Sequence, residues 1–111
     1  MKNKIDLTKY LKKGSVIFSG RDSGKEVRKK IKLDIIDNDE IKYTIIFPDN
    51  LELLSNSFFL GLFGKSYLSL GLQKFNEKYL FYLDNLEYKD SIQTDIDDGI
   101  SYITTNINSI D

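Results

Sequence analysis

The chain has 111 residues, 41% of them hydrophobic and 30% charged, which predicts a single folded domain over residues 1–111. Cysteine and histidine are both missing from the sequence, which removes disulfides, a thiolate nucleophile and the commonest metal ligand and general base. We therefore expect no metal, no cofactor and no enzymatic activity. The net charge is −1, yet residues 1–32 carry 11 basic and 3 acidic side chains.

The first half of the chain predicts two short strands, one helix and a third strand. The strands are expected at residues 5–7 and 15–19, with a lysine-rich turn or short helix at 8–13 between them. Glycines and an aspartate predict a turn at 20–24. Val27, Ile31 and Ile35 recur four residues apart, which predicts an amphipathic helix over 24–36 with Asp22 or Ser23 as its N-cap. Residues 41–47 are β-branched and aromatic and predict a central strand.

Residues 55–72 are the most apolar part of the sequence, because Lys65 is their single charged side chain. They predict a helix from Phe58 to Leu72, with Ser55 or Ser57 as its N-cap. Such a helix must be buried on most sides or lie against a partner. The glycines and Lys65 interrupt it, so we expect a core or interface helix and no membrane span.

The last third predicts one more strand and one more helix. The strand is centred on residues 79–83. Isoleucines at helical spacing predict a helix over 91–106, and these are Ile92, Ile96, Ile100, Ile103 and Ile107. The alternation of strands and helices predicts an α/β fold, with a small mixed or mainly parallel sheet of about four strands and three helices.

Two segments carry a resemblance to a known family. They are FSGRDSGKEVRKKI at 18–31 and LSNSFFLGLFGKSYLSLGLQKFNEKYLFYL at 54–83. Together they resemble the STAS-like domains of unknown function, which are related to the STAS domains of bacterial anti-sigma-factor antagonists. The resemblance covers about residues 15–105. It implies a small α/β sandwich with a regulatory, signalling role in protein contact.

In that family, the loop and helix that here begin at Ser55 bind ATPases of the histidine-kinase-like fold. The resemblance therefore implies such an ATPase as the partner. The family's phosphorylated serine lies next to an aspartate, whereas the corresponding positions here are Asn56 and Ser55. Ser55 and Ser57 remain candidate phosphorylation sites, although capping the helix already explains both. We expect a cytoplasmic protein.

The sequence places the candidate partner-binding surface at the start of the apolar helix, with the turn at Arg21 as a charged rim. Phe58, Phe59, Leu62 and the neighbouring glycine either belong to a fully buried helix or leave one edge exposed for docking. The proposed contact residues are Ser55, Asn56, Ser57, Phe58, Phe59, Gly61, Leu62 and Arg21.

The basic N-terminal third supports an alternative function, which is binding of nucleic acid or another polyanion. Arg21, Lys25 and Arg28 are the candidate anion contacts, and Lys29 and Lys32 extend the same run. GRDSGKE at 20–26 does not match a phosphate-binding loop, because its spacing is one residue short. The sequence contains no known nucleic-acid-binding motif, so this alternative is second to protein contact. Pairing of two copies through a thinly covered sheet face is also open.

Overall fold

The computed structural model describes residues 3–106 and 108. Within this range the chain forms five short strands, four α-helices and a 3-10 turn, η1 (Thr8–Tyr10). The strands are β1 (Lys4–Asp6), β2 (Ile17–Phe18), β3 (Tyr43–Ile46), β4 (Leu53–Leu54) and β5 (Tyr79–Tyr82). The helices are α1 (Arg21–Ile31), α2 (Leu33–Ile36), α3 (Asn56–Lys78) and α4 (Lys89–Thr105).

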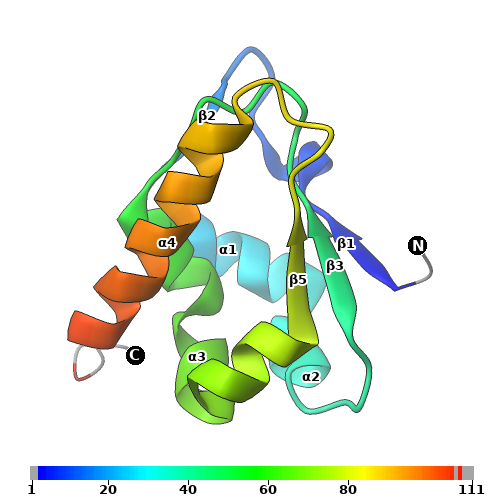
Figure 1. Cartoon of the computed structure of the whole chain (residues 1–111), viewed down its shortest axis with the longest axis vertical. Coiled ribbons are helices and arrows are strands. Elements are labelled where there is room, and N and C mark those ends of the chain that lie inside the picture. Colours follow the sequence, from blue (N-terminus) through cyan, green and yellow to red (C-terminus); the bar gives the residue numbers. More distant parts are fainter. Residues whose placement is uncertain (1–2, 107, 109–111) are drawn as a thin grey trace.

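Three of the strands form a parallel sheet in the order β1-β3-β5, in which Ile5, Ile45 and Phe81 are aligned in one row. Parallel neighbours need crossover connections, and α1 and α3 lie in the two that join these strands. Figure 1 shows α1, α3 and α4 on the same side of the sheet. β2 and β4 form a separate parallel pair.

The prediction of an α/β fold with parallel strands is confirmed, but the counts of strands and helices were wrong. The strands form two sheets instead of one. The two-residue strand β4 was not predicted, because hydrophobic alternation cannot be recognised over so short a segment.

The predicted helix over 24–36 is in fact two helices, α1 and α2. Lys32 has a φ of 60°, a left-handed conformation that ends α1 before α2 begins at Leu33. The break turns Ile35 away from the core, and its side chain is 68% exposed although it continues the four-residue spacing. The predicted N-caps were also wrong, because α1 begins at Arg21 directly after Gly20 and has no side-chain cap.

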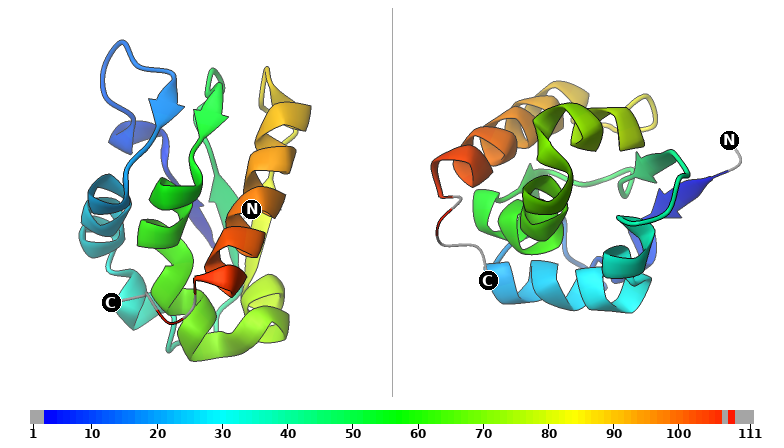
Figure 2. Two further views of the ribbon diagram at one scale, coloured as in Figure 1. Left: turned by 90° about the vertical axis from the view of Figure 1, so that its left-hand side faces the viewer. Right: turned by 90° about the horizontal axis from the view of Figure 1, so that it is seen from below.

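The apolar helix α3 begins at Asn56, two residues before the predicted Phe58, and extends further than predicted. The Ser55 side chain caps its first turn. The predicted end at Gly71 and Leu72 is a kink instead, at which Gly71 has a φ of 79°. After the kink the chain continues in helical form to Lys78, and β5 begins at the next residue (Figure 2).

The last helix, α4, lies within one or two residues of its predicted bounds. Its isoleucines Ile92, Ile96 and Ile103 are buried, as their spacing predicts. Ile107, which continues that spacing, lies outside the described residues. Asp95 accepts a hydrogen bond from the backbone N–H of Leu54 at 2.9 Å, which joins α4 to β4.

The core lies between the three-stranded sheet and α3. Aromatic rings fill it, with Phe63 within 5.7 Å (ring centroids) of Phe75, Tyr79 and Phe81. On the other face of the sheet, Leu80 is 65% exposed. Pairing of two copies through this face stays a prediction.

Candidate functional site

The apolar residues at the start of α3 belong to the core. Phe58, Phe59 and Leu62 are at most 1% exposed, and Gly61 is buried. Phe58 stacks on Phe18 of β2 at 4.6 Å between ring centroids, with 9° between the planes. The prediction that these side chains form a docking surface was therefore wrong, because α1, α4 and both sheets enclose α3. The alternative of a buried helix is confirmed for them.

The polar residues at the same helix start remain at the surface. The Ser55 Oγ accepts the Phe58 N–H at 3.1 Å, which makes Ser55 the N-cap. The Ser57 Oγ lies 3.3 Å from the Ser55 Oγ. Asn56 is exposed. Phosphorylation of Ser55 or Ser57 stays a prediction, and a phosphate on Ser55 would disturb the cap.

Arg28 is buried at the centre of a polar network that joins α1, α2 and α3. Its Nη1 donates to the Leu62 carbonyl at 2.9 Å and to the Ser66 Oγ at 2.8 Å. Its Nη2 donates to the buried Asp37 carboxylate at 2.6 Å. Arg28 is therefore a buried residue whose donors all have partners within the chain, and its predicted role as an anion contact stays a prediction.

Besides Arg28, two hydroxyl groups donate hydrogen bonds to Asp37. The Tyr79 hydroxyl donates to the Asp37 Oδ1 at 2.5 Å, and the Ser66 hydroxyl donates to its Oδ2 at 2.8 Å. Burial, followed by the hydrogen bond to Asp37, raises the pKa of Tyr79 far above its usual value. Tyr79 therefore stays protonated at neutral pH and continues to donate to Asp37, which also accepts hydrogen bonds from Ser66 and Arg28.

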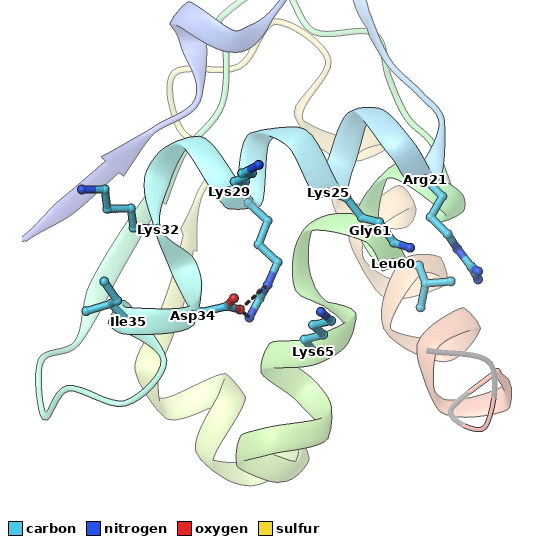
Figure 3. A pocket seen from close by; sticks show the side chains of 10 residues that line it. Arg21, Lys25, Lys29, Lys32, Asp34, Ile35, Leu60, Gly61 and Lys65 are labelled. Carbon is cyan, nitrogen blue, oxygen red and sulfur yellow. Dashed lines mark hydrogen bonds and ion pairs between the residues drawn. The ribbon is translucent and has the colours of Figure 1, made fainter. Parts of the chain in front are cut away.

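A groove of about 560 Å³ lies beside this network, between α1, α2 and α3 (Figure 3). Arg21, Lys25, Lys29 and Lys32 approach it from α1 and its C-cap, at spacings of four, four and three residues. Such spacing places side chains on one face of a helix. Lys65 of α3 lines the opposite wall.

The groove is also lined by apolar residues and by a carboxylate, so its surface is not purely basic. Ile35 supplies exposed apolar surface, and the buried Leu60 lies against the groove. Asp34 is the one acidic residue among the described residues that line the groove, and Arg28 lies at its inner end, within the buried network. The groove is thus an electropositive concave surface with an apolar component.

Several predicted residues meet in this groove, but Asp34, Ile35, Leu60 and Lys65 were not predicted as site residues. Arg21, Lys25, Arg28 and Gly61 all line it, although the sequence had assigned them to two separate hypotheses. Lys65 was read only as an interruption of an apolar helix. Its position as the single charge in 55–72 was a signal that this face of the helix reaches the surface.

A second basic groove, of about 790 Å³, lies on another side of α1. It is lined by Lys9, Lys12, Lys13 and Lys30 together with Glu26. Lys30 forms an ion pair with Glu26 at 3.0 Å, which reduces the positive charge there. The basic residues of the N-terminal third therefore do not form one continuous surface.

Lys78, near the kinked end of α3, forms a second polar cluster outside the grooves. Its Nζ donates to the Asp39 carboxylate at 2.7 Å and to the Ile41 carbonyl at 2.7 Å. Desolvation acts to raise the pKa of Asp39, but hydrogen bonds from Lys78 and Tyr43 outweigh it and lower the pKa to about 2. The hydrogen bond that Tyr43 donates to Asp39 raises the pKa of Tyr43 to about 12.

Comparison of the chain with protein-family models, curated proteins and solved structures found no match. The resemblance to STAS-like domains therefore stays an expectation. Across residues 3–106 and 108, no group of three or more acidic side chains is placed to hold a metal ion. None of the helices in that part of the chain has the length and apolar character needed to cross a membrane.

Proposed function

We propose that this chain is a non-enzymatic, regulatory protein-interaction module that binds an acidic segment of a partner protein in the groove between α1 and α3. The observation that carries the proposal is that Arg21, Lys25, Lys29, Lys32 and Lys65 all line one concave surface. A concave surface lined by one sign of charge attracts the opposite charge and orients it before contact.

The composition of the groove favours a protein segment over nucleic acid. Ile35 is 68% exposed at its rim and offers a contact for an apolar side chain. No aromatic ring is among its described lining residues, whereas aromatic rings are the usual stacking platforms for bases. A peptide that combines carboxylates with a few apolar residues complements this surface best. The resemblance to STAS-like domains makes an ATPase of the histidine-kinase-like fold the first partner to test.

Binding of a model peptide tests the proposal. A fluorescein-labelled peptide of alternating glutamate and leucine is titrated with the protein, and its anisotropy is measured at low and moderate salt. We expect the double variant Lys29→Glu, Lys65→Glu to bind about tenfold or more weakly than wild type, because both walls of the groove then repel the peptide.

The matched control is the double variant Lys12→Glu, Lys13→Glu, which makes the same change of charge at the second basic groove. We expect its affinity for the peptide to change by less than about threefold, as a long-range effect of net charge. Equal losses in both double variants would refute the assignment to the groove.

Nucleic acid is tested in the same titration with a labelled single-stranded oligonucleotide. If the oligonucleotide binds more tightly than the peptide and its affinity falls steeply with salt, the polyanion alternative replaces the protein partner.

A further inference from the structure

The guanidinium group of Arg28 has one edge that is held inside the fold and one edge that faces the groove. An arginine has five N–H donors. Leu62, Ser66 and Asp37 accept three of them, and these three contacts are buried. The remaining two, from Nε at 3.0 Å and from Nη2 at 2.7 Å, go to a single oxygen of Asp34.

Asp34 differs from the other partners of Arg28 because its side chain is 76% exposed, whereas that of Asp37 is 3% exposed. The Arg28 end of this ion pair is buried, at 7% exposed, but its Asp34 end lies in solvent, where water competes for the carboxylate. The three buried hydrogen bonds hold the guanidinium in place without Asp34. The Nε–H and one Nη2–H of Arg28 therefore form a preorganised pair of donors, which the Asp34 carboxylate covers on the groove side.

We propose that a phosphate monoester on the bound segment displaces Asp34 from Arg28, so that the groove recognises phosphorylated partners and Asp34 is a built-in competitor. This inference rests on the proposed function, because it assigns a ligand to the same groove. The donor pair formed by Nε and Nη2 matches two oxygens of a phosphate group.

Charge explains why a phosphate is favoured over another carboxylate. Replacing the Asp34 carboxylate by a partner's carboxylate exchanges one such ion pair for another and adds no charge at the site. A phosphate monoester carries a charge of about −1.5 to −2 near neutral pH and has three acceptor oxygens. Its additional charge and its third oxygen can be shared with cations of the groove such as Lys29 and Lys65.

The test uses the two arginine side chains as reporters, since the chain contains only Arg21 and Arg28. The Nε–H signals of both are followed by ¹⁵N NMR while glycerol 2-phosphate or succinate is added at about pH 7.5, where both probes are close to dianionic. The proteins compared are wild type, Asp34→Ala and, as a control for loss of one exposed carboxylate elsewhere, Asp98→Ala on α4.

We expect glycerol 2-phosphate to shift the Arg28 signal in wild type, and to do so at about tenfold lower concentration in Asp34→Ala. Asp98→Ala should match wild type, and succinate should be the weaker probe in all three proteins. Asp34→Asn provides a second variant, which keeps the shape of the side chain and should lie between wild type and Asp34→Ala.

Two outcomes separate this inference from the proposed function. If the Arg21 signal responds to both probes while the Arg28 signal does not move, the groove binds anions but the inference is wrong. The inference also fails if succinate and the phosphate shift Arg28 equally in Asp34→Ala. If neither probe moves any signal from the groove, the proposed function fails as well.

Discussion

Where the two helices cross, Gly24 of α1 faces the backbone of α3 and Gly61 of α3 faces the backbone of α1. A Cβ atom at Gly24 would lie 2.9 Å from the Leu62 nitrogen and would overlap the Phe58 carbonyl oxygen. A Cβ atom at Gly61 would lie 3.0 Å from the Lys25 nitrogen and would overlap the Arg21 carbonyl oxygen. The two helices can approach this closely only because both positions lack a side chain. This close approach also sets the distance between the two walls of the basic groove.

Alanine at either glycine of this crossing is expected to destabilise the protein. The new methyl group meets backbone atoms, which cannot rotate away, so Gly24→Ala and Gly61→Ala should each lower the free energy of unfolding by about 1–3 kcal/mol or more. Gly14→Ala is the matched control, because its Cβ would meet no atom within 4 Å and only its φ of 82° opposes the change. Urea denaturation followed by circular dichroism measures all three. A loss at Gly61 no larger than that at Gly14 would contradict this account of the crossing.

The two carboxylates that contact Arg28 should differ strongly in their contribution to stability. Asp37→Ala leaves the buried guanidinium and the Tyr79 hydroxyl without their acceptor, so we expect a loss of about 3–5 kcal/mol. Asp34→Ala removes an exposed partner, and we expect a loss of at most about 1 kcal/mol. Thermal or urea unfolding of the two variants makes the comparison. Similar losses at the two positions would show that Asp34 is also a structural residue.

The ion pair between Asp39 and Lys78 should make stability depend on acid pH. Folding lowers the pKa of Asp39 from 3.8 to about 2, so the folded protein binds fewer protons there than the unfolded chain. The stabilisation from Asp39 is therefore complete above about pH 4 and is lost as the pH falls towards 2. We expect Asp39→Asn to be less stable than wild type at about pH 5 and to lose less of its stability between about pH 4 and 2. Urea midpoints at several pH values measure this, with Asp98→Asn as the control. An unchanged pH slope in Asp39→Asn would exclude Asp39 as the cause.

A charge at Phe58 is expected to unfold the protein. The Phe58 ring is 1% exposed and stacks on Phe18, so Phe58→Asp would bury a carboxylate without a partner. Phe58→Ala should lower the free energy of unfolding by about 3–5 kcal/mol through lost burial and a cavity. Leu68→Asp is the control on the same helix, because Leu68 is 50% exposed, and this variant should stay folded. Circular dichroism and thermal melts compare the three. A folded Phe58→Asp protein with a native melting curve would mean that the ring is accessible.

Local features of the fold were predicted best. The isoleucines of α4, the Ser55 cap of α3 and the apolar segment of β3 depend on residues within a few positions of one another, so their patterns are visible in the sequence. The end of α1 was missed because Lys32 adopts a left-handed conformation that no glycine or asparagine signals. The kink in α3 was read as its end, because a glycine at a positive φ is compatible with either outcome.

The candidate site was only partly visible in the sequence. The order of the charges located the basic residues of α1, and the apolar character of residues 55–72 required that helix to be buried or to lie against a partner. The sequence alone therefore determined that the chain forms an α/β fold with an apolar helix shielded from water and a basic segment before it. Only the tertiary structure decided that Phe58 is core, that Lys65 faces Arg21 and Lys29 across a groove, and that Arg28 is held by Ser66, 38 residues away. These relationships depend on how α1 packs across α3, and no periodicity in the sequence encodes contacts over such a separation.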